Sequence, residues 1–436
     1  MRSTITAVLL AVTLALPVSA NEYYVDPVDG AAGNDGSAAT PWKSVQDVVR
    51  SGRLAPGDVV RLRSGYHGAL LITGHHNAGA ITIKADDGHE PRLRQVRISD
   101  SSRWILSGLA ISPSHARTAL FTPIVEIDAT SRDIVLSDSR IESVADSAGR
   151  TAEEWRLGTA HAVLSFGEAI EIRGNTIRNI RHGVGVTGPR AIVENNLIED
   201  FIGDGIRVLG DHSEIRGNTI RNCYVVDDNH DDGIQSWSLD AEGRAGRGEV
   251  VGVVLSGNTI INHEDPAHPL RCNLQGIGLF DGIFVDWVIE NNVVVVEHGH
   301  GITVMGARNV RAVNNTVVDL VPEGPWQPWV TITAHKDGRL PEDSLIANNL
   351  AHSYNLEKGF DAAGFVTGPT GVALRDNMEI DDPDRFFVDA AAFDFRLRES
   401  SPAIGAGNAA DAPAVDRSGA PRSTGGAVDL GAYERQ

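Results

Sequence analysis

Positive charge is scarce in this chain. Its 436 residues carry 38 Lys and Arg against 58 Asp and Glu, a net charge of −20. A nucleic-acid partner needs a basic surface to meet its phosphates, so the composition argues against one. An anionic substrate is not excluded on this ground, because a local basic cluster or a bound cation can override the global charge.

Cysteine is nearly absent: the chain has only Cys223 and Cys272. Their spacing fits no zinc motif. The two residues can pair in an oxidising compartment, or they can be two separate buried thiols. The sequence also contains no nucleophilic serine elbow and no glycine-rich phosphate loop between a strand and a helix, which removes two common enzyme classes.

Long apolar runs are missing beyond the start of the chain. Met1 and Arg2 precede an apolar stretch from Ala7 to Leu16, and small residues follow up to Ala20. This pattern is typical of a signal peptide, here cleaved after Ala20. No later segment approaches ~20 apolar residues. We therefore expect no membrane insertion and a secreted or periplasmic protein.

A repeated asparagine motif is present instead. Each copy places Asn after Gly or Asn and before a short apolar strand, as in Gly217-Asn218-Thr219-Ile220. The anchoring asparagines are Asn175, Asn196, Asn218, Asn258, Asn292, Asn315 and Asn349. The shorter intervals predict a rung of about 22 residues, and the longer ones predict the same rung with inserted loops. Stacked rungs would bury their apolar columns, and turn asparagines would bond to one another along the stack.

These features resemble the right-handed parallel β-helix proteins over roughly residues 80–400. We expect an all-β right-handed parallel β-helix solenoid with an N-terminal capping helix, in which Thr40 is the N-cap and Pro41 the first helical residue. The predicted organisation is a signal peptide over 1–20, a strand and capping helix over 21–79, the β-helix over 80–385 and a C-terminal closing segment over 386–436.

A second motif, a Gly-Ile pair preceded by a polar residue, recurs on neighbouring rungs. Aligning the rungs on this pair predicts one column that contains His182, Asp204, Asp232, Gln275 and His300. Three residues further on, a parallel column contains Gly185, Arg207, Gln235, Gly278 and Thr303. Because stacked rungs are about 4.8 Å apart, Asp204 and Asp232 should be neighbours, with Asp231 beside them. Carboxylates this close repel, so at least one pKa should rise.

The pieces Asn229-His230-Asp231-Asp232 and Gly299-His300-Gly301 are similar to motifs of the polygalacturonases, which are inverting glycoside hydrolases. An extra rung with Gln275 and the lack of an Arg-x-Lys motif depart from that family. The resemblance implies that Asp232 is the acid, that Asp204 and Asp231 activate water, that His300 supports them, and that Lys336 binds substrate or assists catalysis. We expect the substrate-binding residues to be Arg207, His230, Gln235, Trp237, Gln275 and His335.

Three alternatives remain open. In a polysaccharide lyase, Asp204, Asp231 and Asp232, together with Asp227 and Asp228, would hold Ca²⁺ against a uronate, and Lys336, His300 or His230 would abstract a proton. A uronan epimerase would use the same chemistry. A noncatalytic carbohydrate-binding or surface β-helix would have no perturbed pKa values. The hydrolase requires no cofactor. We favour a monomeric hydrolase that binds a polysaccharide along the solenoid.

Overall fold

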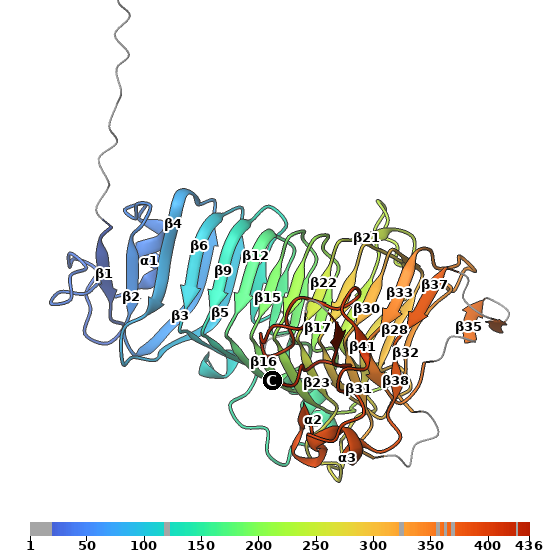
Figure 1. Ribbon diagram of the computed structural model, residues 1–436. Coiled ribbons are helices and arrows are strands. Elements are labelled where there is room, and N and C mark those ends of the chain that lie inside the picture. Colours follow the sequence, from blue (N-terminus) through green and yellow to red (C-terminus); the bar gives the residue numbers. More distant parts are fainter. Residues whose placement is uncertain are drawn as a thin grey trace, which may run out of the picture.

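Short parallel strands wind into one elongated coil (Figure 1). The computed structural model describes residues 20–116, 123–321, 327–354, 358–361, 364–367, 371–423 and 426–436. The signal peptide expected over residues 1–20 lies outside this part except for Ala20. Within the described residues, no helix is both long and apolar enough to cross a bilayer.

One face of the coil is a 13-stranded parallel sheet. Its strands in order are β1 (Glu22–Val25), β2 (Val59–Leu62), β4 (His76–Ala85), β6 (Ser102–Ser107), β9 (Arg132–Ser137), β12 (Glu168–Arg173), β15 (Ile192–Glu194), β18 (Glu214–Arg216), β22 (Val254–Ser256), β26 (Val288–Glu290), β30 (Arg311–Val313), β33 (Ser344–Ala347) and β37 (Val372–Arg375). Successive strands pair in register, so Val193 lies beside Ile215 and Ile215 beside Leu255. All three are fully buried.

A second sheet bends into two bands, which its first strands, β3 (Gly65–Thr73) and β5 (Pro91–Ser99), span together. The band that follows the asparagine turns contains β7 (Ala110–Ile111), β10 (Arg140–Glu142), β13 (Thr176–Ile180), β16 (Leu197–Phe201), β19 (Thr219–Cys223), β23 (Thr259–Ile261), β27 (Val293–Val295), β31 (Thr316–Val318), β34 (Leu350–Ala351) and β38 (Met378–Glu379). The other contains β8 (Val125–Ile127), β11 (Val163–Ser165), β14 (Val184–Val186), β17 (Ile206–Val208), β20 (Asp232–Trp237), β24 (Gln275–Asp281), β28 (Ile302–Met305) and β32 (Val330–Thr333). We call this second group the site band.

The predicted asparagine ladder is confirmed. Asn218 Nδ2 donates to Asn258 Oδ1 at 3.0 Å, and Asn258 Nδ2 donates to Asn292 Oδ1 at 3.0 Å. The ladder runs from Asn175 to Asn349 as expected and continues to Asn377. The residue before each rung asparagine has a left-handed backbone, which explains why that position holds Gly, Asn or Asp.

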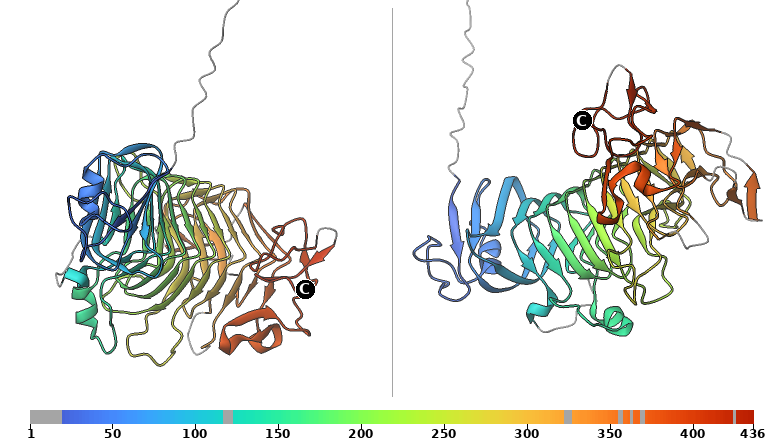
Figure 2. Two further views of the ribbon diagram at one scale, coloured as in Figure 1. Left: turned by 90° about the vertical axis from the view of Figure 1, so that its left-hand side faces the viewer. Right: turned by 60° about the horizontal axis from the view of Figure 1, so that its bottom comes forward.

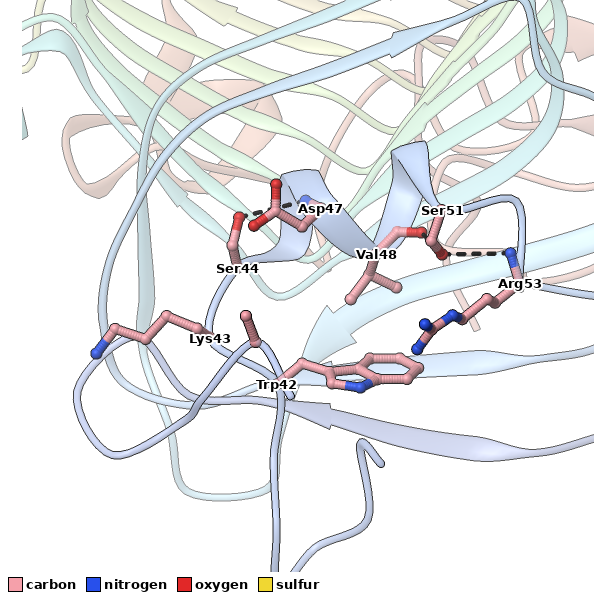
Figure 3. Close-up of a pocket in the computed structure, with 8 residues that line it drawn as sticks. Trp42, Lys43, Ser44, Asp47, Val48, Ser51 and Arg53 are labelled. Atoms are coloured by element: carbon pink, nitrogen blue, oxygen red, sulfur yellow. Dashed lines mark hydrogen bonds between the residues drawn. The ribbon is translucent and has the colours of Figure 1, made fainter. Parts of the chain in front are cut away.

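The N-terminal part differs from the prediction at two points. Helix α1 (Val45–Arg50) begins after Ser44, whose side chain accepts from the Asp47 amide (Figure 3), and not after Thr40. The reason is that Trp42 pairs with Val25, which keeps this segment extended. In addition, β1 and β2 belong to the 13-stranded sheet, so the coil begins near residue 22 and not at residue 80. The helix lies at the N-terminal end of the coil, as expected of a cap (Figures 1 and 2).

The C-terminal segment lies along the side of the coil (Figure 2). The closing segment predicted over residues 386–436 therefore covers a side face of the coil. Its apolar residues pack against the outer face of the band that follows the asparagine turns, which we call the asparagine-turn band. One cluster joins Phe387, Phe395 and Leu430 of the segment to Val295 and Val318 of this band. Its described elements are α3 (Pro383–Phe386), β39 (Phe387–Asp389), η2 (Ala390–Ala392), β40 (Asp394–Leu397), β41 (Gly407–Asn408) and β42 (Ala427–Val428).

Four further groups complete the described structure. They are η1 (Pro113–Ala116), α2 (Ala152–Gly158), the three-stranded sheet of β21 (Glu249–Val251), β25 (Ile283–Val285) and β29 (Ala307–Arg308), and the hairpin of β35 (Lys358–Asp361) and β36 (Gly364–Thr367). Helix α2 carries a complete capping box between Thr151 and Glu154.

Candidate active site

The rung alignment predicted from the Gly-Ile pairs is confirmed by the strand register. Arg207 lies opposite Gln235, Gln235 opposite Gly278, and Gly278 opposite Thr303. Asp232 likewise lies opposite Gln275. The two predicted columns of residues therefore run along the site band, as the sequence indicated.

Glycine is required in the Gly-Ile pairs because the rungs approach closely there. A Cβ at Gly205 would stand 2.7 Å from the carbonyl oxygen of Gly233, and a Cβ at Gly233 would stand 2.8 Å from that of Gly276. Either distance is too short for a side chain. The Gly-Ile motif thus marks where neighbouring rungs are in close contact. The polar residue before each motif therefore lies at the same position on every rung.

Asp204 is buried, with 1% of its surface exposed, and is held by three groups. Its Oδ1 accepts from the backbone N–H of Asp232 at 3.0 Å, and its Oδ2 accepts from the Arg207 guanidinium. Burial raises the pKa of Asp204, whereas the charge of Arg207 opposes that shift by favouring the ionised form. The Asp204 N–H donates to His182 Nδ1 at 2.8 Å.

His182 does not form an ion pair with Asp204, although its Nδ1 lies 3.8 Å from Asp204 Oδ2. Burial, with a contribution from the charge of Arg207, lowers the pKa of His182 to about 2. The ring is therefore neutral, and it acts as an acceptor that fixes the backbone of Asp204.

Asp232 is fully buried, and only one of its two oxygens is paired. Gln235 Nε2 donates to Oδ2 at 2.8 Å, while Oδ1 has no hydrogen-bond partner. This oxygen lies in the space that Gly278 leaves open, since a Cβ there would overlap both Asp232 Oδ1 and the ring of Phe280. Burial and then the charge of Asp204 raise the pKa of Asp232 well above its usual value.

Asp231 is also buried and lies beside a disulfide bond. Cys223 and Cys272 are paired, and the Cys223 sulfur is 3.5 Å from Asp231 Oδ2. Asn229 Nδ2 donates to Asp231 Oδ1 at 2.7 Å. Burial raises the pKa of Asp231 to about 7, and the negative charge of Asp204 adds to that effect against the Asn229 hydrogen bond. This disulfide settles the alternative that the sequence left open.

His300 belongs to an aromatic cluster on the same band. Its ring lies 4.9 Å from that of Phe280 and 5.1 Å from that of Trp329, centroid to centroid. The Trp329 indole N–H donates to Thr303 Oγ1, and Thr303 Oγ1 lies 2.9 Å from His300 Nδ1. This chain of bonds favours a ring proton on Nε2. Burial, with smaller contributions from His298, His230 and Lys336, lowers the pKa of His300 to about 4, so the ring is neutral at pH 7.

The predicted basic residues of the next rung are engaged with carboxylates. Lys336 Nζ lies 2.8 Å from Asp281 Oδ1, and His335 Nδ1 lies 2.8 Å from Asp337 Oδ1. Arg339 pairs with the same Asp337 at 2.7 Å. The ammonium of Lys336 also lies 6.0 Å from the Phe280 ring centre, which connects this pair to the His300 cluster.

The other predicted binding residues surround the carboxylates. The Arg207 guanidinium stacks over Trp237 at 5.5 Å, a cation–π contact. Gln275 is buried with its Oε1 unpaired. His230 is exposed, and it lies close enough to His298 and His300 to contribute to the lowering of their pKa values. All of these residues therefore lie near the carboxylate and histidine clusters.

Among the described residues, the carboxylates considered for Ca²⁺ do not converge into one ligand set, although Asp204, Asp231 and Asp232 lie next to one another. Asp227 Oδ2 is 2.9 Å from Arg181 Nη2, and Asp228 is exposed. Among the described residues, the one group of three potential ligands within metal-binding range is Cys223, Asp231 and Cys272. Since its two sulfurs form a disulfide, this group offers no thiolates. The donor set therefore does not fit a calcium ion as it stands.

Three residues of the site were not predicted from the sequence: Gly278 as a spacer, Phe280 as a neighbour of Asp232, and Asp281 as the partner of Lys336. A signal was available for Gly278, because it has no side chain at the column position that holds Gln235 and Thr303 on the neighbouring rungs. Asp281 gave no signal, because 55 residues separate it from Lys336.

Comparison with known proteins agrees with the fold. A family model described as right-handed beta helix region matches residues 161–327. The chain is a right-handed parallel β-helix. The complex of XylC with xylose superposes with a TM-score of 0.59 and 10% identity, covering 95% of this chain and 98% of that chain.

Pectate lyase Pel9A gives a TM-score of 0.52 and 14% identity over 96% of this β-helix and 98% of its own chain. The predicted resemblance to right-handed parallel β-helix proteins is thereby confirmed. No curated protein matches in sequence. Since both identities are low, these similarities bear on the fold, and the function must be argued from the site.

Proposed function

We propose that this protein is a secreted glycoside hydrolase that degrades a polysaccharide bound along the site band. The observation that carries the proposal is the contrast between neighbouring buried carboxyl groups. Asp204 is paired with Arg207, which favours its ionised form, whereas Asp232 keeps a free oxygen and has a strongly raised pKa. Two carboxyl groups whose environments separate their protonation states are what glycoside hydrolysis requires.

In this mechanism Asp232 is the general acid. Its protonated carboxyl donates a proton to the glycosidic oxygen as the bond to the anomeric carbon breaks. Asp204, as the general base, takes a proton from the water that attacks the same carbon. Asp231, whose pKa of about 7 lies close to neutrality, assists that base in its ionised form.

His300 and Arg207 have supporting roles. A neutral His300 with its proton on Nε2 donates a hydrogen bond to a sugar oxygen, and Thr303 and Trp329 keep the ring in that orientation. Arg207 orients Asp204 and brings Trp237 alongside, where the indole provides a face for a sugar ring. Gln275, Gln235, His230, His335 and Lys336 complete the proposed binding surface.

A calcium-assisted lyase or an epimerase is the second candidate. Pectate lyase Pel9A has a similar fold, which is why a lyase is considered, but two observations favour hydrolysis. The carboxylates considered for calcium do not converge within binding distance among the described residues, and Asp227 is paired with Arg181. The Thr303 contact favours a ring proton on His300 Nε2, so that nitrogen is not free to accept one, and Lys336 is paired with Asp281.

A noncatalytic carbohydrate-binding β-helix is the third candidate. It gives no reason for burying three carboxyl groups beside one another. Raised pKa values in a cluster of this kind are more typical of active sites than of turns, so they favour an enzyme.

The test is incubation of the mature chain with a panel of polysaccharides. A hydrolase releases new reducing ends without the ultraviolet absorbance of an unsaturated uronate, and Asp232→Asn should abolish that release. Asp286→Asn is the matched control, because Asp286 is exposed and lies in a turn outside the site band. Unsaturated products that disappear with a chelator would reject hydrolysis in favour of the lyase.

A further inference from the structure

The charges around the column bear on which polysaccharide it binds, an inference that rests on the proposed hydrolase function. Four Arg and Lys side chains at the candidate site have acidic partners. Arg207 pairs with Asp204, Lys336 with Asp281 at 2.8 Å, and Arg339 with Asp337 at 2.7 Å. Arg181, beside His182, pairs with Asp227 at 2.9 Å. A uronate carboxylate would find no unpaired cation among these residues.

Two buried oxygens at the site have no hydrogen-bond partner. They are Asp232 Oδ1 and Gln275 Oε1. Both atoms lie on adjacent rungs, since Asp232 is opposite Gln275. A buried acceptor needs a donor, and an amide oxygen can only accept. Sugar hydroxyl groups donate, whereas an ionised carboxylate only accepts.

Phe280 offers an apolar surface beside Asp232. A Cβ at Gly278 would overlap both Asp232 Oδ1 and the Phe280 ring, so the ring and this oxygen lie close together. The His300 ring and the Lys336 ammonium also lie near the Phe280 ring. An aromatic ring in this place provides an apolar face for a pyranose, and no charge is needed for that contact.

We propose that this site takes a neutral polysaccharide, in which a hydroxyl group donates to Gln275 Oε1 and the glycosidic oxygen accepts from protonated Asp232, and that it discriminates against uronate chains. Two features act together. The free amide oxygen favours a hydroxyl donor, and the carboxylate of Asp231, once ionised, repels an anionic sugar because the nearby Arg and Lys side chains are already paired.

The experiment uses matched substrates. The mature protein is incubated with uronans, with the same uronans after chemical reduction of their carboxyl groups, and with neutral xylans, galactans, mannans and glucans. We expect new reducing ends from one or more neutral chains, with at least a tenfold preference over any uronan. New reducing ends mainly from a uronan would overturn the inference and leave the hydrolase standing. Unsaturated uronate products would overturn both.

Binding covers the case in which nothing is cleaved. The Asp232→Asn protein is passed over gels of the same polysaccharides. Retention by neutral chains would support the substrate class even if hydrolysis fails. Preferential retention by a uronan, or failure to be retained by any neutral chain, would overturn it.

A variant provides an independent check. Asp281→Asn releases the Lys336 ammonium from its ion pair, so it should strengthen retention on a uronan gel severalfold relative to the parent protein. Asp286→Asn, which removes the same charge away from the site band, should not. Equal retention of the two variants would contradict the claim that paired cations exclude uronates.

Discussion

Asp232 keeps a free oxygen because residue 278 of the next strand has no side chain. Gln235 donates a hydrogen bond to Asp232 Oδ2, whereas Asp232 Oδ1 lies close to the Phe280 ring. Asp204 instead has a guanidinium partner. At this scale the chemistry depends on a few contacts, each of which a single substitution can remove.

Gly278→Ala should reduce activity by about 10- to 100-fold, since displacing a catalytic group by about 1 Å has effects of that order. The added methyl group would overlap Asp232 Oδ1. The measurement is kcat on whichever substrate the panel identifies. Gly185→Ala is the control, because a Cβ there would meet the end of the Leu164 side chain at 3.0 Å and the Val163 carbonyl oxygen at 3.9 Å, but no catalytic group. Equal losses for both variants would show that the effect is not specific to Asp232.

Asp231→Asn should stabilise the protein at alkaline pH. Burial raises the pKa of Asp231 from 3.8 to about 7, so the folded state holds this proton more tightly than the unfolded state. The contribution of Asp231 to stability is therefore present below pH 4 and is lost as pH rises to about 7. We expect the variant to gain about 1–3 kcal/mol over the parent at pH 8 and nothing at pH 4.

Urea unfolding at the two pH values measures this difference, with Asp286→Asn as the exposed control. The same substitution should remove the rise in activity between pH 6 and 8 that follows ionisation of Asp231. An unfolding difference independent of pH would mean that Asp231 titrates normally.

At the scale of elements, the asparagine ladder joins one rung to the next. Asn258 receives hydrogen bonds from the backbone and side chain of Asn218, and it donates to Ile215 and Asn292. Each member thus satisfies backbone groups that the turn would otherwise leave buried and unpaired. The ladder keeps the rungs in register, and the register places Asp204 beside Asp232.

Asn258→Ala should lower the free energy of unfolding by about 2–4 kcal/mol, because it leaves more than one buried group without a partner. Asn377→Ala, at the last and partly exposed rung of the ladder, should lower it by less than half as much. Chemical denaturation of both variants makes the comparison. Similar losses would indicate that each asparagine acts locally and not as part of a continuous ladder.

At the scale of the whole molecule, the C-terminal segment joins several rungs from outside. Arg422 Nη2 donates to Asn291 Oδ1 at 2.9 Å, and Gly431 N–H donates to the Asn348 carbonyl. Phe387 and Phe395 lie in the apolar cluster with Val295 and Val318. The segment therefore covers apolar surface that the asparagine-turn band presents on its outer face.

Phe387→Ala should destabilise the protein by about 3–5 kcal/mol, the usual loss for a buried phenylalanine. Phe387 is 1% exposed, whereas its neighbour Val388 is 49% exposed, so Val388→Ala serves as the control and should have an effect below about 0.5 kcal/mol. Thermal or urea unfolding measures both. A negligible loss for Phe387→Ala would mean that the segment packs only weakly against the coil.

Much of the site followed from the sequence because its residues share the period of the rungs. Asp204, Asp232, Gln275 and His300 each precede a glycine that the close stacking requires. A residue at one place in a repeat must lie beside its counterpart in the next, so the column could be derived without coordinates. The expected roles of these residues remain predictions.

Contacts without that period could not be derived. Lys336 and Asp281 belong to different rungs, and the flexible Lys336 side chain can reach more than one partner, so the repeat does not predict this pair. The α1 start was missed because Trp42 pairs with Val25, and the placement of the C-terminal segment depends on apolar surface far away in sequence.

The sequence by itself determined the coil, the asparagine ladder and the column of carboxylates, because each is a local pattern repeated at a constant interval. Only the tertiary structure decided which carboxylate has a cation, which oxygen stays free near Phe280, and that Cys223 and Cys272 pair beside Asp231. These depend on distances between side chains, which the repeat does not specify.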